Sequence, residues 1–355
     1  MIDCDVHCAP ASIDALTPYL SDYWRQYIEG AAVHLHGLVL AYPPGAPTSA
    51  SDRARGFPAP AVPASYDALK ERVLDETDAD LVVLNCLTAL EAHRNPYYAA
   101  ALATAVNDWV RDEFLERDER LRASIAVSIA APEDAVAEIE RRAEDPRYVQ
   151  VLLPVRSELP WGHRSNHPIF AAAARHDLAV GLHAWGRPGQ APTPSGFTTT
   201  YLEDYVANQT IAQSQLISLV CEGVFDSHPD LRVVLIECGF AWLAPLLWRF
   251  EKDWKSIWRE VPWVKQPPSE YVYRHFRATT APAHLPRDQH AIRQLVEMVD
   301  VGRLLAYASD YPHDHGDGLS LLLAELDDEG RGAVLSTNAA ELYGRATPGR
   351  SATAR

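Results

Sequence analysis

Short apolar runs rich in Val, Ile and Leu recur along the chain, and the segments between them have apolar positions at a helical period. Eight runs have the length of strands: 2–6, 80–85, 122–127, 149–153, 178–183, 232–237, 276–280 and 304–309. The clearest helical segments are 97–117, 132–143 and 167–176. This alternation predicts eight βα units closed into a (β/α)8 barrel. An open, doubly wound sheet is the alternative, and the lack of a G-x-G-x-x-G after the first strand disfavours it.

No feature of the pattern separates two domains. Residues 1–345 are therefore predicted to form one barrel, followed by a flexible tail at 346–355. Two stretches dense in Pro, Ala, Gly and Ser, at 41–65 and 186–200, each follow a predicted strand. We expect them to be loops at the C-terminal face of the barrel, where barrel enzymes carry their active sites. The alternative is that both are disordered insertions with no role.

Composition narrows the class of protein. Hydrophobic residues make up 47% and charged residues 23% of the 355 residues, as in a globular protein. The formal net charge of −16 and the absence of Lys/Arg runs disfavour a nucleic-acid partner. No apolar run reaches the roughly 20 residues of a membrane span, so a cytoplasmic protein without membrane contact is expected. The five scattered cysteines are expected to be reduced, structural thiols.

Residues of metal-ligand type occur at the ends of the predicted strands. Asp5 and His7 are two residues apart, so both point to the same side of the first strand. His183 ends the fifth strand, and Asp310 follows the eighth. Because strand ends converge at one mouth of a barrel, the four side chains offer mixed nitrogen and oxygen ligation suited to zinc, manganese or iron. Cys4 and Cys8 are expected to face away from this set and to pack.

Three further residues are candidates at the same mouth. Glu237 ends the apolar sixth strand, and a buried carboxylate there must be paired, protonated or ligating. An ion pair with Arg187 or Arg249 is the simpler explanation. His313 and His315 follow in ASDYPHDHGDG, and each is a candidate general acid or second-metal ligand. Simple solvent exposure is the favoured explanation for His315.

Other histidines and the tryptophans carry weaker signals. The pair in HLHG (His34 and His36) precedes a loop without nearby partners, and the histidines in WGHRSNHP (His163 and His167) form only a dense local group. Five tryptophans fall in the segment 242–263. Their helical spacing gives a broad aromatic face, which we expect to be core or a subunit interface.

Four motifs in order resemble the amidohydrolase-related family, in the branch that includes aminocarboxymuconate-semialdehyde decarboxylase. They are the Asp-x-His of the first strand, GLHAWG, HPDLRVVLIECGFAWL and YASDYPH, and the match covers nearly the whole chain. The resemblance implies a distorted (β/α)8 barrel of the metal-dependent hydrolase type. It also implies one divalent ion held by Asp5, His7, His183 and Asp310, with Asp310 as proton shuttle. Zinc is the expected ion, and manganese and iron are alternatives.

The chain departs from this family at two places. Decarboxylases of the family usually carry a histidine at the end of strand six, where this chain has Glu237. The carboxylate could act as a base, or join His313 and His315 around a second ion, as in a few dinuclear, oxygen-activating relatives. The fourth strand ends near Arg156 and offers no lysine of the kind carboxylated in binuclear hydrolases.

Three activities remain as hypotheses. The first is a metal-dependent hydrolase that uses a metal-bound water on a small, carboxylated molecule, with Asp310, Glu237 and His313 as catalytic residues. In it, Arg156 or Arg187 would anchor the substrate carboxylate. The second is a non-oxidative decarboxylase, and the third is a dinuclear oxygenase or its partner subunit. A fourth hypothesis is that the barrel serves only for binding or oligomer assembly and is not an enzyme. The resemblance also implies a homo-oligomer such as a dimer, with a hetero-oligomer as the alternative.

Overall fold

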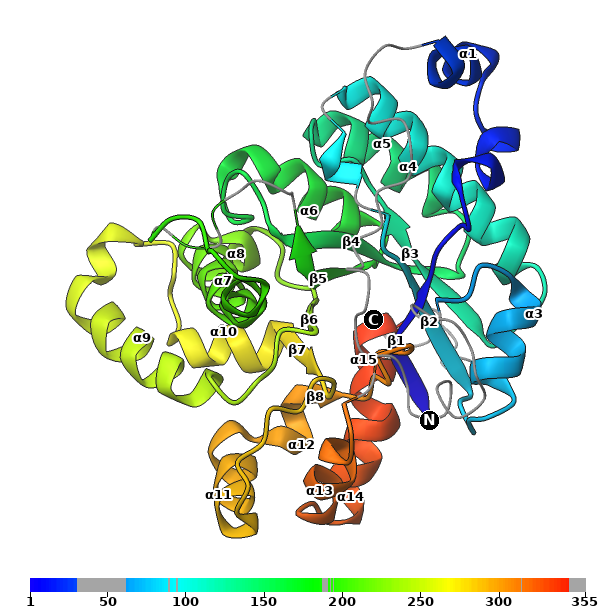
Figure 1. Ribbon diagram of the computed structural model, residues 1–355. Helices are drawn as coiled ribbons and strands as arrows, with labels where there is room; N and C mark the ends of the chain where they lie inside the picture. The colour runs from blue at the N-terminus through cyan, green and yellow to red at the C-terminus, as the bar shows by residue number, and fades with distance from the viewer. Residues whose placement is uncertain are drawn as a thin grey trace.

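Eight parallel strands form one sheet in which neighbours in space are neighbours in sequence. The computed structural model describes residues 1–30, 62–88, 90–93, 95–186, 191, 193, 195–313 and 315–344. Figure 1 shows the strands at the centre of the molecule with helices around them. The strands are β1 (Ile2–Cys8), β2 (Leu81–Cys86), β3 (Leu121–Ala126), β4 (Tyr148–Arg156), β5 (Ala179–Gly186), β6 (Val233–Ile236), β7 (Phe276–Thr279) and β8 (Leu305–Ala306).

Backbone hydrogen bonds between the β8 segment and β1 close the sheet into a barrel. The amide of Cys4 donates to the carbonyl of Tyr307 (2.9 Å), and the amide of Asp310 donates to the carbonyl of Asp5 (3.0 Å). Since these bonds join the last strand to the first, the predicted (β/α)8 barrel is confirmed and the open sheet is wrong. β8 is shorter than predicted because the amide of Tyr307 donates instead to the carbonyl of Val334 (2.9 Å).

Helices surround the sheet and follow most of its strands. The three helices predicted from periodicity are confirmed, because α4, α5 and α6 fall on the predicted segments and each has a proline in its first turn. The described helices are α1 (Asp22–Gly30), α3 (Tyr66–Leu69), α4 (Pro96–Val110), α5 (Pro132–Arg142), α6 (His167–Arg175), α7 (Tyr201–Cys221), α8 (Val224–Ser227), α9 (Leu243–Ile257), α10 (Pro268–His275), α11 (Gln289–Val299), α12 (Val301–Leu304), α13 (Gly318–Ala324), α14 (Asp328–Gly332) and α15 (Asn338–Tyr343).

Two apolar layers hold the barrel together. The larger layer packs the outer side of the strands against the helices, and the smaller one joins residues of β1, β2, β4, β5, β6 and β8 to α15. Cys4 belongs to the smaller layer and Cys8 to the larger one. The prediction that both cysteines share the face opposite Asp5 is therefore wrong for Cys4. The cause is a shift in the pairing of β1 with β2 between Asp3 and Val6, which interrupts the alternation of side chains.

Several predicted segments lie partly or wholly outside the described residues. These are 41–61 of the first loop, 187–190 with 192 and 194 of the second loop, the pair His34 and His36, and the tail 346–355. In the described part of the chain, no helix is long and apolar enough to cross a bilayer.

The tryptophan segment is divided between core and surface. Trp242 and Trp254 pack against the larger apolar layer, whereas Trp248 on α9 is 61% exposed. Trp258 and Trp263 are 43% and 44% exposed. The prediction of a core segment is thus confirmed for two of the five side chains, and a role of the other three in subunit contacts stays a prediction.

The buried imidazole of His275 predicts a pH dependence of stability. Burial lowers its pKa, and its ring stacks on that of Phe225 with centroids 4.4 Å apart. Because the folded protein binds a proton at His275 less readily than the unfolded chain, protonation favours unfolding. The folded state is therefore most stable above the unfolded pKa of about 6.5 and loses stability as the pH falls below it. We expect the free energy of unfolding in urea to fall between about pH 7.5 and about pH 5.5, and to fall less in His275→Gln. Equal falls in both proteins would contradict this assignment.

Candidate metal centre

The barrel brings the predicted ligands together at the C-terminal ends of its strands. Asp5 and His7 lie on β1 and His183 on β5, and all three are buried. Glu237 directly follows β6, and Asp310 follows the β8 segment. Both carboxylate residues have positive φ angles, of 55° and 54°. This left-handed conformation costs a residue other than glycine about 1–3 kcal/mol and is concentrated at functional sites.

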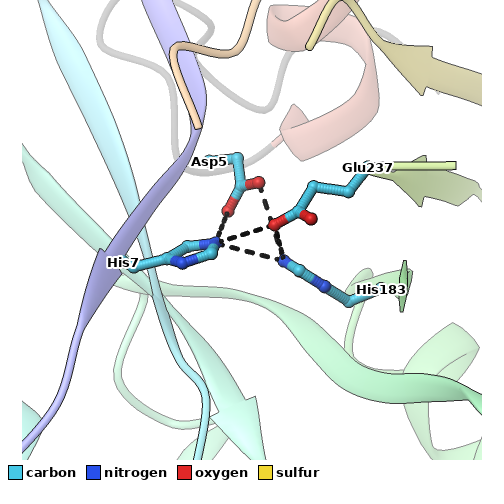
Figure 2. A group of neighbouring side chains, drawn as sticks. All are labelled: Asp5, His7, His183 and Glu237. Atoms are coloured by element: carbon cyan, nitrogen blue, oxygen red, sulfur yellow. Dashed lines mark hydrogen bonds and ion pairs between the residues drawn. The ribbon is translucent and has the colours of Figure 1, made fainter. Parts of the chain in front are cut away.

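Figure 2 shows four side chains that converge on one point: Asp5, His7, His183 and Glu237. Nε2 of His7 lies 3.3 Å from Oδ1 of Asp5, 3.2 Å from Oε1 of Glu237 and 3.3 Å from Nε2 of His183. Nε2 of His183 in turn lies 3.2 Å from the same Glu237 oxygen. Nitrogen and oxygen atoms from three strand ends are therefore held within van der Waals distance of one another.

These spacings fit a bound cation. Ligand atoms about 2.0–2.1 Å from a tetrahedral ion are about 3.3 Å apart, close to the separations seen here. Two buried carboxylate oxygens of the group, Oδ2 of Asp5 and Oε1 of Glu237, have no hydrogen-bond partner among the described residues. Such orphaned oxygens are costly unless a cation compensates their desolvation. The donor set of imidazole nitrogen and carboxylate oxygen suits a divalent ion.

A second group overlaps the first and contains His7, Glu237, Asp310 and His313. Oδ1 of Asp310 lies 3.3 Å from Nε2 of His7 and 2.9 Å from Nδ1 of His313. The other oxygen of Asp310 lies 2.5 Å from Nε2 of His315. The expectation that His315 is merely exposed is therefore wrong, because its half-buried ring contacts the central carboxylate.

Charges in the centre compensate one another. Burial alone would raise the pKa of the Asp5 carboxyl, but His7 and His183 lower it to about 2. Burial opposes a charge on His7, yet Asp5, Glu237 and Asp310 raise the pKa of its imidazole well above the usual range. His313 and His315 hold the pKa of Asp310 well below its usual range in the same way, against the effect of burial. The ionised forms of Asp5 and Asp310 are therefore favoured, and positive charge on the imidazole side stabilises them.

Comparison with known proteins identifies the family. The family profile described as Amidohydrolase matches residues 2–345, almost the whole chain. The chain belongs to the amidohydrolase family. The resemblance inferred from the four sequence motifs is thereby confirmed.

Individual relatives of the chain are distant. The gamma-resorcylate decarboxylase of Rhodococcus jostii strain RHA1 is 26% identical over 314 residues, which cover 79% of this chain and 92% of that protein. An amidohydrolase structure from Mycobacterium avium subsp. paratuberculosis K-10 gives a TM-score of 0.71, with 20% identity over 97% of both chains. A dihydroxybenzoic acid decarboxylase from Polaromonas sp. JS666, solved with manganese and 2-nitroresorcinol, gives 0.64, with 18% identity over 96% of both chains. At these identities the structural likeness shows the fold alone.

Neither Arg156 nor Arg249 has an ion pair with a residue of the candidate metal centre among the described residues. The guanidinium of Arg156, at the end of β4, binds both carboxylate oxygens of Asp204 at 2.8 Å. A substrate carboxylate would have to displace Asp204 to reach it. Arg249 is exposed and pairs with Asp253 at 3.3 Å, so the expected pair with Glu237 is wrong for Arg249. Arg187 lies outside the described residues. Nδ1 of His163 lies 2.8 Å from the hydroxyl of Ser165, and Nε2 of His167 lies 3.0 Å from the carbonyl of Gly162. Neither ring belongs to the groups of candidate metal ligands among the described residues.

Two features beside the ligands are not predicted by the sequence pattern. Nδ2 of Asn85 donates to Oδ1 of Asp5 at 2.7 Å. The ring of Trp185 packs edge-on against His183, with centroids 5.0 Å apart, and its indole N–H donates to the buried Glu91 carboxylate at 2.8 Å. Asn85 could have been noticed as the one polar residue inside LVVLNC. Glu91 lies in a short 3₁₀ helix (Leu90–Ala92) that no periodicity predicts.

The ligand assignment predicts loss of metal from a double variant. Asp5→Ala/His183→Ala removes one oxygen ligand and one nitrogen ligand. Loss of a residue that only hydrogen-bonds to a ligand lowers metal affinity ~10–100-fold, so the affinity of the metal-free double variant for Mn²⁺ should fall by more than that. Calorimetric titration with Mn²⁺ measures it, and the exposed variant Glu222→Gln provides the control. Stoichiometric binding of manganese by the double variant would refute the ligand set.

Proposed function

We propose that this member of the amidohydrolase family is a metal-dependent, non-oxidative decarboxylase of a hydroxylated aromatic acid. The observation that supports it is the relationship to gamma-resorcylate decarboxylase across 79% of the chain, combined with a buried ligand cluster at the barrel mouth. The sequence alone favours hydrolysis first and decarboxylation second. The relatives favour the second hypothesis.

Asp5, His7, His183 and Asp310, the set that the family resemblance implies, are the proposed ligands of one divalent ion. In the structure, Glu237 lies within reach of the first three and Asp310 lies 3.3 Å from His7, so Glu237 borders the proposed ion and remains available for proton transfer. When bound, the ion would act as a Lewis acid that binds substrate oxygens and neutralises their negative charge. Manganese is the ion we propose to test first, because the Polaromonas decarboxylase was solved with it. The nitrogen and oxygen donors of this site suit zinc and iron as well.

Glu237 and His313 are the proposed proton-transfer residues. Decarboxylation breaks the bond between the ring carbon and the carboxylate, releases CO₂ and needs one proton at that carbon. Oε1 of Glu237 lies 3.7 Å from Nδ1 of His313, which itself lies 2.9 Å from Oδ1 of Asp310. His313 can therefore hold a proton beside both carboxylates, and a carboxyl group at Glu237 can deliver it. Glu237 would take the role of the histidine that decarboxylases of the family usually carry at the end of strand six.

Trp185 supports an aromatic substrate. Residues two apart on a strand point to the same side, so Trp185 follows His183 toward the mouth. Its indole is half-buried and fixed by the hydrogen bond to Glu91, which leaves a rigid aromatic surface beside a metal ligand. Aromatic side chains stack favourably on planar rings, with an energy of about 0.5–1.5 kcal/mol beyond simple burial.

A carbon dioxide release assay tests the proposed reaction. Manganese-loaded protein should release CO₂ from 2,6-dihydroxybenzoate or a related hydroxybenzoate, and chelator-treated protein should not. Glu237→Gln should lower kcat by about 10²–10⁴-fold, because the amide cannot donate the proton, and the control Glu222→Gln should leave kcat unchanged. Hydrolysis of amides or esters without any CO₂ release would instead restore the hydrolase hypothesis.

The overlapping second group favours one further candidate, a dinuclear centre. Glu237, Asp310, His313 and His315 would share a second ion with the first group, as expected of a dinuclear oxygenase or its partner subunit. We expect elemental analysis of protein purified without added metal to give about one ion per chain, and no oxygen uptake during turnover. About two irons or manganese per chain, with oxygen uptake, would replace the decarboxylase proposal by the dinuclear one.

A further inference from the structure

A layer of polar side chains lies inside the barrel beneath the candidate metal centre. The interior of a (β/α)8 barrel is normally filled by branched apolar residues. Here Asn85 on β2, Ser124 on β3 and Gln150 on β4 are all buried, and Ser124 pairs in register with Gln150. Buried amides and hydroxyls cost free energy unless they are hydrogen-bonded. The contacts of this layer therefore decide whether it stabilises or destabilises the barrel.

In this layer, each donor lies nearer to α15 and each acceptor nearer to Asp5 along the series of hydrogen bonds. Tyr343 of α15 donates its hydroxyl to Oε1 of Gln150 at 3.3 Å. The amide nitrogen of Gln150 donates to Ser124 at 2.7 Å and to Oδ1 of Asn85 at 3.1 Å. The hydroxyl of Ser124 donates to the same Asn85 oxygen. Because its oxygen is taken by two donors, the NH₂ group of Asn85 faces the first strand, where it donates to Oδ1 of Asp5 at 2.7 Å and, at the longer distance of 3.4 Å, to the carbonyl of Cys4.

The backbone of β5 makes room for this chain of side chains. A Cβ added at Gly181 would lie 3.1 Å from both Cδ and Oε1 of Gln150, and 3.0 Å from a methyl carbon of Ile236. Those distances are shorter than ordinary van der Waals contacts. Glycine on β5 therefore allows the long side chain of Gln150 to reach across the interior toward Asn85.

The series of hydrogen bonds ends on the carboxylate of Asp5, whose two oxygens have different surroundings. Oδ1 of Asp5 accepts from Asn85, while the buried Oδ2 has no hydrogen-bond partner among the described residues and lies 3.6 Å from Nε2 of His183. A carboxylate fixed in this way presents a defined oxygen to an ion. Outer hydrogen bonds that orient a ligand typically contribute about 10–100-fold to metal affinity.

We propose that Asn85 is a positioning residue that fixes Asp5 for metal binding, and that Ser124, Gln150 and Tyr343 fix Asn85 in turn. The C-terminal helix α15 is thereby coupled to the metal centre through side chains alone. The inference rests on the metal centre of the proposed function and not on the reaction that the centre carries out.

Manganese affinity of the full-length chain tests the proposal. Metal-free protein is titrated with Mn²⁺ in a calorimeter, and the thermal midpoint of unfolding is recorded for each variant. Asn85→Leu removes the donor to Asp5 and should weaken Mn²⁺ binding about 10–100-fold. Asn85→Asp keeps the shape but replaces the donor by an acceptor, and should weaken binding as well. Gln150→Leu should cause a smaller loss, and Tyr343→Phe the smallest, because each is one step further from Asp5.

Asn338→Leu is the matched control. Asn338 is a buried asparagine on the same helix as Tyr343, and it donates to the carbonyls of Gly302 (2.8 Å) and Leu305 (2.7 Å) outside the series of hydrogen bonds. Its loss should lower the thermal midpoint but leave Mn²⁺ affinity within about twofold of the wild type. This separates positioning of Asp5 from general stability of the barrel.

Two results with the variants would overturn the proposal alone. One is Mn²⁺ affinity within about twofold of the wild type in both Asn85 variants, and the other is an equal loss in Asn338→Leu. A wild-type chain that binds no manganese would overturn it together with the centre. Graded losses of affinity in a protein that releases no CO₂ from aromatic acids would leave this inference standing and refute only the decarboxylase proposal.

Discussion

The structure depends on the crowding of ionisable atoms around Nε2 of His7. Oxygens of Asp5, Glu237 and Asp310 and a nitrogen of His183 all lie 3.2–3.3 Å from this atom. Three carboxylates cannot stay this close in a buried site unless positive charge lies among them, since like charges and desolvation both oppose it. The barrel mouth therefore needs a positive charge among these atoms. Both the stability of the site and its chemistry depend on this charge.

Backbone geometry keeps this arrangement from relaxing. Both carboxylate residues that follow strands, Glu237 and Asp310, occupy the left-handed region. The side chain of Asp3 accepts hydrogen bonds from the amides of Asp5 (3.2 Å) and Ser309 (3.0 Å), and so ties the first ligand strand to the segment that carries Asp310. Burial raises the pKa of Asp3 to about 7, although these hydrogen bonds act in the opposite direction. The segments that carry Asp5 and Asp310 are thus joined by the side chain of Asp3, whose own burial costs free energy.

Much of this could be predicted from the sequence, because strand order in a barrel fixes which residues share the mouth. The spacing of Asp5 and His7 and the position of His183 after an apolar run were sufficient to bring the three together. Side-chain partners could not be predicted in the same way. The shift in β1 that turns Cys4 toward the smaller apolar layer, the pairing of Arg156 with Asp204, and the contact of His315 with Asp310 all depend on local backbone positions that periodicity does not encode.

The position of one proton links the two functional hypotheses. Asp5, Glu237 and Asp310 bring three carboxyl groups to Nε2 of His7. Nδ1 of His313 lies 2.9 Å from Asp310 and 3.7 Å from Glu237, so a proton there lies beside two of these groups. A second cation bound by the same atoms would displace that proton. The decarboxylase hypothesis needs the proton and the dinuclear hypothesis needs the second cation, so the two hypotheses require different occupants of the same place in the centre.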